Sequence, residues 1–499
     1  MSGAQGEGTG FDRSRECFES AVGFLSGPEA ASLTHGELET RLTVDLRALV
    51  RQLYQDHLDL RALREERIAE VLGADGVRRG SVETAHVRPL TTVFGAVNVT
   101  RLAYRRRGED NLYPADAALN LPVEVHSHGL REISAIESAR GSFEEAAGAV
   151  CRATGVGIGK RQVEQLAACS AVDFEAFYQG ASRTQAKDGD LLVLSADGKG
   201  IVMRPDALRP ATAKAAGKST AKLKTRLSKG EKRNRKRMAE VGAVYDVTPV
   251  ARTPTDIIGR EDDEAKTPAP KAKNKWLTAS VVDDAATVIA SIFAEAQRRD
   301  PAHERSWVAL VDGAKHQIDC IKSEAKAHQL EVAIVCDFVH VLEYLWSSAW
   351  SFFSEGDPRA EVWVAEKALG VLRGKASTVA ASIRRKATYL GLDARGRENA
   401  DSCADYLLAK RDYLNYPRAL KEGWPIATGV IEGACRHLVK DRLDLTGSRW
   451  GLNGAEAILK LRALRSNGDF ENYWKFHLNR EQQRVHQARF ATGAIPRAA

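Results

Sequence analysis

The chain has 499 residues, of which 43% are hydrophobic and 28% are charged. That balance is typical of a folded water-soluble protein, and the length is enough for two to four domains. No apolar run reaches the roughly 18 to 20 residues that cross a bilayer, so we expect no membrane segment. The polar, glycine-rich start lacks the apolar centre of a secretory signal, and we expect a cytoplasmic protein.

The seven cysteines form no C-x-x-C pair and match no zinc-knuckle or zinc-ribbon spacing. An odd number of cysteines in a chain without an export signal also argues against a disulfide framework. We therefore expect scattered, reduced thiols.

The net charge of +7 is concentrated in one segment. Residues 204–237 contain only two acids, Asp206 and Glu231, among many lysines and arginines. Such a run favours an anionic partner, most often a nucleic-acid backbone, although a solvated loop without a partner has the same composition. The residues expected to contact phosphates here are Lys232, Arg233, Arg235, Lys236 and Arg237.

The first part of the chain is expected to combine a flexible leader, helices and a hairpin. Residues 1–40 are small and polar, as in a leader. Apolar residues then recur at helical spacing over 42–72, which predicts one long helix or two shorter ones. An alternating, β-branched pattern follows and predicts a β-hairpin with strands 88–94 and 97–104 and a turn at Gly95 and Ala96.

Residues 142–170 have the pattern of a helix-turn-helix. Ser142 is the expected N-cap of a helix over 143–152, a glycine-rich turn spans 154–159, and a second helix opens at Lys160. Polar donors at the start of a second helix suit reading of a DNA major groove, but a helical hairpin that only packs has the same pattern. The candidate DNA-contacting residues are Lys160, Arg161, Gln162 and Gln165.

From residue 189 strands and helices alternate. Strands are predicted over 191–196, 200–204, 241–250, 306–313 and from 331, with helices over 283–299, 315–328 and 339–353 and a loop over 253–275. This β-β-β-α-β-α-β-α order predicts an α/β fold with an RNase H-like core, a mixed five-stranded sheet with flanking helices. The expected segments are the leader (1–40), an N-terminal helical and hairpin region (41–185), the core (186–356, basic loop 205–240), a helical insertion (357–420) and a catalytic helix with basic C-terminal helices (421–499).

Three acids stand where a metal site is expected. Asp197 and Asp312 each end a hydrophobic strand and precede glycine, and the carboxyl edge of an α/β sheet is the usual place for a ligand. Glu432 lies on a helix that Thr428 would cap. Carboxylates suit hard Mg²⁺ or Mn²⁺, and phosphodiester chemistry commonly uses two such ions. Alone, each acid could instead be a turn, capping or helix-dipole residue.

Asp337 is the alternative to Asp312 as the second of the three expected metal-binding acids. It precedes the helix that carries His340 three residues later, on the same helical face. A capping aspartate and a packing histidine are the alternative interpretation of this pair.

Four motifs, SADGKG, VDGAKHQ, CDFVHVLEYLW and the segment from GVIEGACRH to LRAL, occur in this order. Together they resemble the DDE transposases of bacterial insertion sequences, most of all the ISKra-four family, with kinship to the ISL-three and Mutator-like groups. The resemblance covers about residues 85–480. It implies metal-dependent strand cleavage and transfer, with Asp197, Asp312 and Glu432 as catalytic metal ligands and Asp337 and His340 as an auxiliary motif. One departure is that the leader has no cysteine zinc motif.

The sequence therefore predicts a DNA transposase that acts in the nucleoid. Its partners would be double-stranded DNA, as terminal inverted repeats and target, and further copies of the same chain on that DNA. Arg436, Lys440 and Arg449, in the basic C-terminal part, are further DNA-contacting candidates. Two other classes have the same sequence features: a non-catalytic or domesticated DNA-binding protein, and a metal-dependent nuclease without strand transfer.

Overall fold

A computed structural model of the chain describes residues 10–183, 189–218, 235–259, 267–445 and 447–498. The chain forms two compact units. The first contains Met1–Phe177 and Asp469–Ala499, and the second contains Tyr178–Gly468. In the sequence-based prediction, the C-terminal segment is grouped with the helix of Glu432. From Asp469 onward, this segment belongs instead to the first unit. Among the described helices, none is long and apolar enough to cross a membrane.

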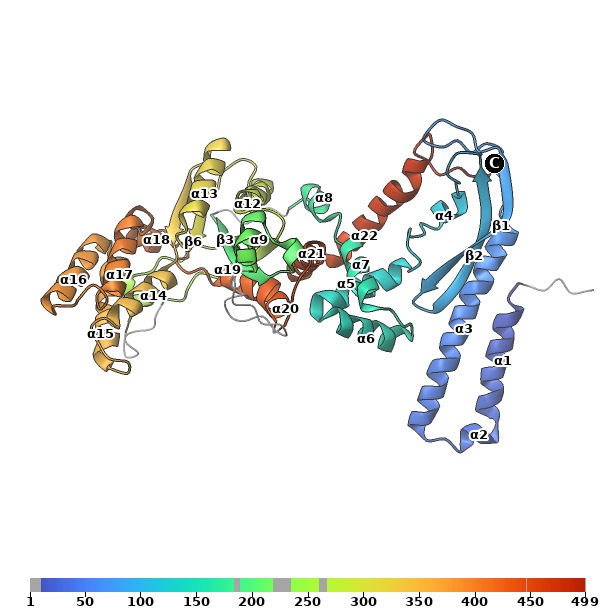
Figure 1. Ribbon diagram of the computed structural model, residues 1–499, viewed down its shortest axis with the longest axis horizontal. Helices are drawn as coiled ribbons and strands as arrows, with labels where there is room; N and C mark the ends of the chain where they lie inside the picture. Colours follow the sequence, from blue (N-terminus) through green and yellow to red (C-terminus); the bar gives the residue numbers. More distant parts are fainter. Residues whose placement is uncertain (1–9, 184–188, 219–234, 260–266, 446, 499) are drawn as a thin grey trace, which may run out of the picture. The chain divides into compact units, whose positions relative to one another are not determined.

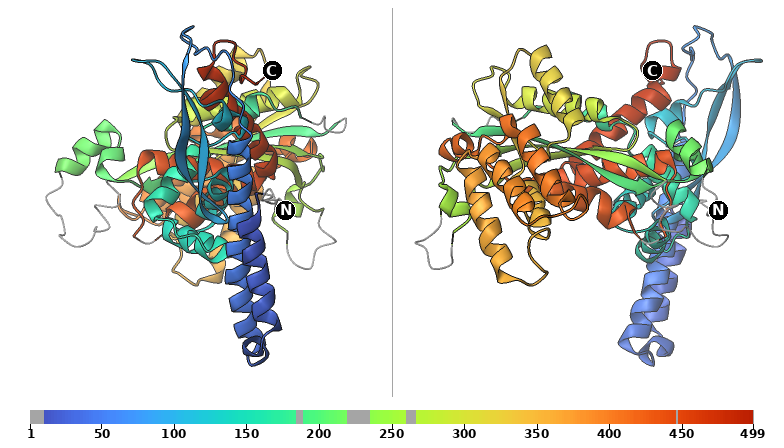
Figure 2. Two further views of the ribbon diagram at one scale, coloured as in Figure 1. Left: turned by 90° about the vertical axis from the view of Figure 1, so that its right-hand side faces the viewer. Right: turned by 60° about the vertical axis from the view of Figure 1, so that its left-hand side comes forward.

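The first unit begins with a helical hairpin. Its elements are α1 (Asp12–Ser26), α2 (Pro28–Ala31) and α3 (His35–Leu63), and Figure 2 shows α1 and α3 side by side. The prediction of a leader over 1–40 is therefore wrong for residues 12–26, 28–31 and 35–40, which are helical, and α1 packs on α3. Thr34 opens α3 with a capping box to Glu37. The long helix ends at Leu63, well before residue 72.

The β-hairpin packs against α3. Its strands are β1 (Ser81–Thr92) and β2 (Gly95–Arg105), longer than predicted, with Thr92 paired to Gly95 across the turn. The turn thus lies at Val93 and Phe94, two residues before the predicted Gly95 and Ala96. Leu58 of α3 joins Leu90, Val97 and Val99 in one apolar cluster. This contact buries the inner face of a hairpin that two strands alone could not stabilise.

The remainder of the first unit is mainly helical. The helices are α4 (Pro114–Ala118), α5 (His128–Arg140), α6 (Phe143–Thr154), α7 (Lys160–Cys169), α22 (Phe470–Glu481) and the start of α8 (Phe174–Gln179). Helices α5, α6 and α7 pack on one another. Asp173, Arg131 and Glu481 surround the buried His477 of α22 and hold that helix within the unit.

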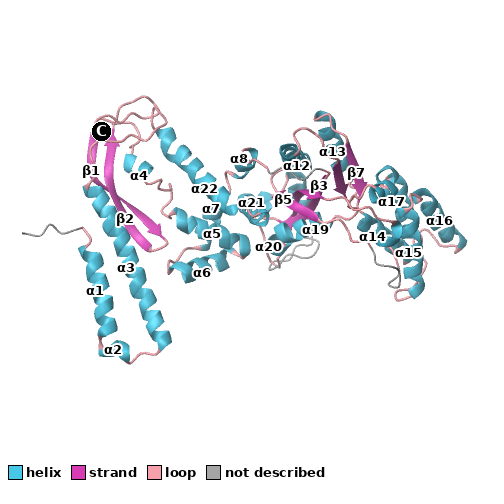
Figure 3. Cartoon of the chain, turned by 180° about the vertical axis from the view of Figure 1, so that it is seen from behind, coloured by secondary structure: helices cyan, strands magenta, loops and turns pink. Residues whose placement is uncertain are grey.

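The second unit is built on a five-stranded mixed sheet (Figure 3). The strands are β3 (Leu191–Val202), β4 (Lys236–Val247), β5 (Ala272–Ser280), β6 (Trp307–Val311) and β7 (Val332–Cys336), in the order β5-β4-β3-β6-β7. The β3–β4 and β4–β5 pairs are antiparallel, and the β3–β6 and β6–β7 pairs are parallel. The prediction of an α/β fold with a mixed five-stranded sheet is confirmed.

Two details of the strands differ from the prediction. The predicted strands 191–196 and 200–204 are replaced by one continuous strand over 191–202, because β4 pairs with β3 through Asp197 and Gly198 without a break. The edge strand β5 replaces the end of the predicted loop 253–275. Its Lys273, Asn274 and Lys275 hide the strand pattern, and charged residues are common on edge strands because they oppose further pairing.

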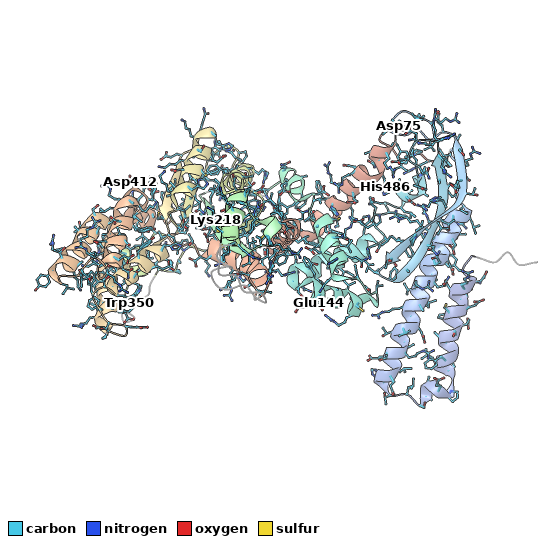
Figure 4. The ribbon with its side chains drawn as sticks, in the orientation of Figure 1. Asp75, Glu144, Lys218, Trp350, Asp412 and His486 are labelled. Atoms are coloured by element: carbon cyan, nitrogen blue, oxygen red, sulfur yellow. The ribbon has the colours of Figure 1, made fainter. Side chains whose placement is uncertain are left out.

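Helices flank the sheet and extend from it. The flanking helices are α12 (Ala285–Arg299), α13 (Lys315–Ala327), α19 (Gly429–Ala434) and α21 (Leu452–Asn467). After β7, α14 (Phe338–Ala349) leads into the helical insertion, α15 (Pro358–Leu372), α16 (Ala376–Tyr389), α17 (Glu398–Ala409) and α18 (Tyr416–Lys421). Short helices α9 (Pro210–Lys218) and α11 (Pro254–Ile257) lie in the connections between strands; Figure 4 labels Lys218 on the first of them.

Candidate functional site

Strand register brings three aspartates level at one edge of the sheet. Ser195 of β3 pairs with Leu310 of β6, and Val311 of β6 pairs with Cys336 of β7. Continuing both registers by one or two residues sets Asp197, Asp312 and Asp337 in one row. Neighbouring strands lie about 4.8 Å apart, so the backbones of these three residues lie side by side where β6 and β7 end.

Asp197 lies inside β3 beside the helix that follows α19. Its Oδ1 accepts the backbone N–H of Gly198 at 2.6 Å, and its Oδ2 lies 3.3 Å from Sγ of Cys435. Cys435 is buried, and burial followed by the nearby Asp197 charge raises the pKa of its thiol far above the usual value. Cys435 is therefore a neutral thiol that donates to the carboxylate.

Asp312 follows β6 directly, as the sequence predicts. Its Oδ1 accepts the N–H of Ala314 at 2.7 Å, forming a tight turn over Gly313, whose φ of +97° favours glycine. The hydroxyl of Tyr406, from the helical insertion, donates to the Asp312 carbonyl at 3.2 Å. The turn is thus held at both ends, and the side chain is half-buried.

Asp337 is completely buried and caps α14. Its Oδ1 accepts the N–H of Val339 at 2.7 Å, and its Oδ2 accepts the hydroxyl of Thr428. Both carboxylate oxygens are therefore engaged by donors within the fold. Together with its complete burial, which the half-buried Asp312 does not share, this arrangement favours the capping interpretation of Asp337.

Glu432 lies in the first turn of α19 and is exposed. Its Oε1 lies 3.2 Å from the same Thr428 hydroxyl that binds Asp337. Thr428 is at the predicted N-cap position, but its side chain does not cap the helix. After Ala434 the helix widens into a π-helical segment, η3 (Cys435–Lys440), a feature often found at functional sites.

One hydroxyl thus lies between two carboxylates. A hydroxyl carries a single proton and can donate to only one of them. The other contact therefore places two hydrogen-bond acceptors next to each other. A proton or a cation between them would remove their repulsion. In the part of the chain that is described, no three His, Cys, Asp or Glu side chains are grouped closely enough to bind a metal ion.

Sequence reasoning missed three residues of this site: Thr428 as a bridge, Cys435 and Glu240. Glu240 pairs across the sheet with Gly198, one residue from Asp197. Burial, and then the charge of Asp197, raise the pKa of Glu240. Only the register of β3 and β4 reveals this neighbour, because Glu240 is 43 residues away in the chain.

His340 does not extend the acidic row. Its Nδ1 pairs with Oε2 of Glu343 at 2.9 Å on the exposed side of α14. Asp337, by contrast, points into the core.

The helix-turn-helix segment has the predicted local structure. Ser142 caps α6 with a capping box to Glu145, and Gly155 ends the helix in the left-handed conformation. Lys160, Arg161, Gln162 and Gln165 are all exposed at the start of α7. Gln162 Oε1 accepts the Gly159 N–H at 3.0 Å, so part of this side chain caps the helix. Lys160 lies 3.8 Å from Glu144 of α6, which Figure 4 labels.

The basic segment is described only in part, and Lys232 and Arg233 lie outside the described residues. Arg235 is half-buried and Lys236 is exposed at the start of β4. Arg237 differs from the expectation of a phosphate contact, because its guanidinium donates to the carbonyls of Val281 and Ala207 at 2.7 and 3.2 Å.

The basic candidates of the C-terminal part are exposed. Arg436 and Lys440 lie on η3, and Arg449 lies shortly before α21. Arg436 also pairs with Asp441 at 3.7 Å, an exposed contact that contributes little to stability.

Neither a protein-family model nor a curated protein matches this chain. What can be said of its activity therefore rests on its own residues.

Replacing Thr428 tests the bridge between α14 and α19. Valine has the shape of threonine but no hydroxyl, and it would leave an oxygen of the buried Asp337 carboxylate without its donor. We expect Thr428→Val to lower the free energy of unfolding by about 1–3 kcal/mol, measured by urea titration. Thr428→Ser keeps the hydroxyl and should lose much less. Equal stability of the valine variant and the natural protein would contradict the bridge.

The raised pKa of Glu240 predicts a pH-dependent effect. Since its folded-state pKa lies above the unfolded value, its contribution to stability is complete at low pH and is lost as the pH rises through the folded-state pKa. Glutamine does not titrate. We expect the melting temperature of Glu240→Gln, relative to the natural protein, to rise between about pH 4 and pH 8. Glu331→Gln, at an exposed position, is the control, and a difference that does not vary with pH would contradict the prediction.

Proposed function

We propose that this protein is a DNA transposase of the DDE type, which cuts and joins DNA strands with divalent metal ions. The observation that carries the proposal is the row formed by Asp197 and Asp312 on neighbouring parallel strands, beside the helix of Glu432. The order of the strands and helices supports an RNase H-like core. The motifs that resemble insertion-sequence transposases agree with both features.

The donor set fits Mg²⁺ or Mn²⁺. Carboxylate oxygens are the ligands that these hard cations prefer, and Asp197, Asp312 and Glu432 would hold them. The acceptor–acceptor contact at Thr428 supports a cation near Glu432, since a positive charge there would remove the repulsion. When bound, such ions would activate the attacking oxygen and stabilise the leaving oxygen of a phosphodiester.

The chain's own residues would position these acids. Gly198 and Ala314 donate their N–H groups to one oxygen of Asp197 and of Asp312, which fixes the two carboxylates relative to the sheet. Tyr406 ties the Asp312 turn to the helical insertion. Cys435 keeps Asp197 beside the helix that carries Glu432.

DNA would be held mainly outside the acidic row. The exposed Lys160, Arg161 and Gln165 at the start of α7 suit contacts to base edges and phosphates. Lys236, Arg436, Lys440 and Arg449 in the second unit are exposed cations suited to phosphates. A nuclease without strand transfer would use the same residues, and only the fate of the cut DNA end separates it from a transposase.

Asparagine substitutions test the acids separately. Asp197→Asn and Asp312→Asn should fold normally and bind DNA, but should cleave at least about a hundredfold more slowly, because an amide lacks the charge that holds a divalent ion. Asp337→Asn should instead lower stability, because its amide nitrogen would face a donor inside the core. The assay is nicking and cutting of a supercoiled plasmid carrying the DNA that flanks the gene, with Mg²⁺ and a parallel gel-shift.

Undiminished cleavage by Asp312→Asn would remove that residue from the site. Loss of DNA binding together with cleavage, in the Asp197 or Asp312 variant, would favour a non-catalytic DNA-binding protein.

A further inference from the structure

The helical hairpin of α1 and α3 has a thin and partly polar core. Ser14 is the one residue of α1 that is fully buried, and the buried residues of α3 are Gln52, Asp56 and Leu58. Ser14 donates its backbone N–H to Asp56 at 3.1 Å, and Gln52 donates to the same carboxylate at 2.7 Å. Buried polar contacts of this kind fix the register of paired helices but add little stability.

Apolar side chains remain exposed on both helices of the hairpin. They recur at spacings of four and three residues and so form one stripe on each helix. The stripes consist of Phe18, Val22 and Leu25 on α1 and of Leu46, Val50 and Leu53 on α3. Each of the six side chains is 37–52% exposed.

The two stripes lie on the same side of the hairpin. The less exposed residues of α1, which face α3, are Ser14, Cys17, Ala21 and Phe24. The stripe on α1 is turned by about 85° from this line, in the sense of increasing residue number, at about 100° per residue. On α3 the stripe is turned by a similar angle, in the same sense, from the less exposed line that faces α1, which contains Leu49, Gln52 and Asp56. Because the helices are antiparallel, equal turns in this sense lead to the same side. The six residues therefore form a single apolar face.

The other sides of α3 either pack within the unit or carry charged residues. Arg47 contacts the carbonyl of Arg152 at the end of α6, at 3.2 Å, so that side packs within the unit. The flank opposite the apolar face carries Glu37, Arg41 and the exposed Val44. Apolar residues are thus concentrated on one flank of the hairpin.

We propose that this apolar face binds the same face of a second copy of the chain, so that two hairpins form an antiparallel four-helix bundle. A two-helix hairpin buries too little apolar surface to form a full core, and pairing of two such layers is the common solution. A face that pairs with itself gives a closed two-fold dimer. The inference concerns the first unit and does not depend on the proposed chemistry.

Charge favours the antiparallel arrangement. Arg15 lies at the root of the hairpin, next to Ser14, whereas Glu39 lies 17 residues from Asp56, about 26 Å toward the tip. When two hairpins pair antiparallel, the root of one lies level with the tip of the other. Arg15 of one copy then lies at the level of Glu39 of the other copy, and parallel pairing would bring like charges level.

The area of the apolar face suits a dimer that associates weakly. A helix as long as α1, 15 residues, extends about 22 Å, and two helices side by side are about 20 Å wide. Two such faces together bury on the order of 1,000 Å², near the lower limit for a specific interface. We therefore expect association at micromolar rather than nanomolar concentrations.

The test is the mass of the full chain in solution without DNA, by light scattering at several tens of micromolar. The natural protein should approach twice the 54.5 kDa of one chain, and Leu46→Glu/Val50→Glu should be monomeric. Val44→Glu is the control: it places a glutamate on the same helix, on the opposite flank, and should stay dimeric. A monomeric natural protein, or a double variant that stays dimeric, would overturn the proposal.

If the double variant does not fold, a disulfide cross-linking experiment still tests the proposal. Leu46 lies near the middle of the face, where two antiparallel copies bring the same residue together. We expect Leu46→Cys to form a disulfide-linked dimer under mild oxidation and Val44→Cys to form none beyond the background of the natural cysteines. Equal cross-linking of the two variants would mean that this face does not pair with itself.

Discussion

The hydrogen bond between Thr428 and Asp337 joins the two points at which the chain leaves the sheet and returns to it. Asp337 ends β7 and starts the helix that leads into the insertion, and Thr428 starts the helix that carries Glu432. The N–H of Phe338 also donates to the carbonyl of Ile426 at 2.8 Å. Because both partners are buried, the contact fixes Glu432 relative to the sheet despite about ninety intervening residues. Together with the hydrogen bond between Cys435 and Asp197, it places the acid on the helix relative to the acids on the strands.

The helical insertion between Asp337 and Thr428 also packs back on the ends of the sheet strands. Residues between Asp337 and Thr428 form helices that pack on one another, while Tyr406 and Tyr416 reach back to the carbonyls of Asp312 and Cys336 at 3.2 and 2.9 Å. The insertion thus supports the ends of β6 and β7. Burial raises the pKa of Tyr406 and of Tyr416, so both remain neutral hydrogen-bond donors.

Much of the fold can be predicted from local pattern. Strands β6 and β7 are short apolar runs, and the helices after Ser142 and Thr428 begin at the predicted positions, although only Ser142 caps its helix with its side chain. The failures have physical reasons. Partner strand β4 keeps β3 continuous through Asp197, and the lysines of β5 mask an edge strand. Glu240 and the bridging role of Thr428 depend on contacts between distant segments, which no local pattern contains. The helix α1 was missed because its stability comes from packing on α3.

The central claim is that Asp197, Asp312 and Glu432 form one divalent-metal site. The most direct measurement is anomalous scattering from crystals of the full chain grown with Mn²⁺. The account predicts an anomalous peak within coordination distance of the Asp197 and Asp312 carboxylates, with Glu432 as a further ligand. A Mn²⁺ ion bound by Asp337 with Asp312 turned away, or crystals with no Mn²⁺ at this edge of the sheet, would contradict it.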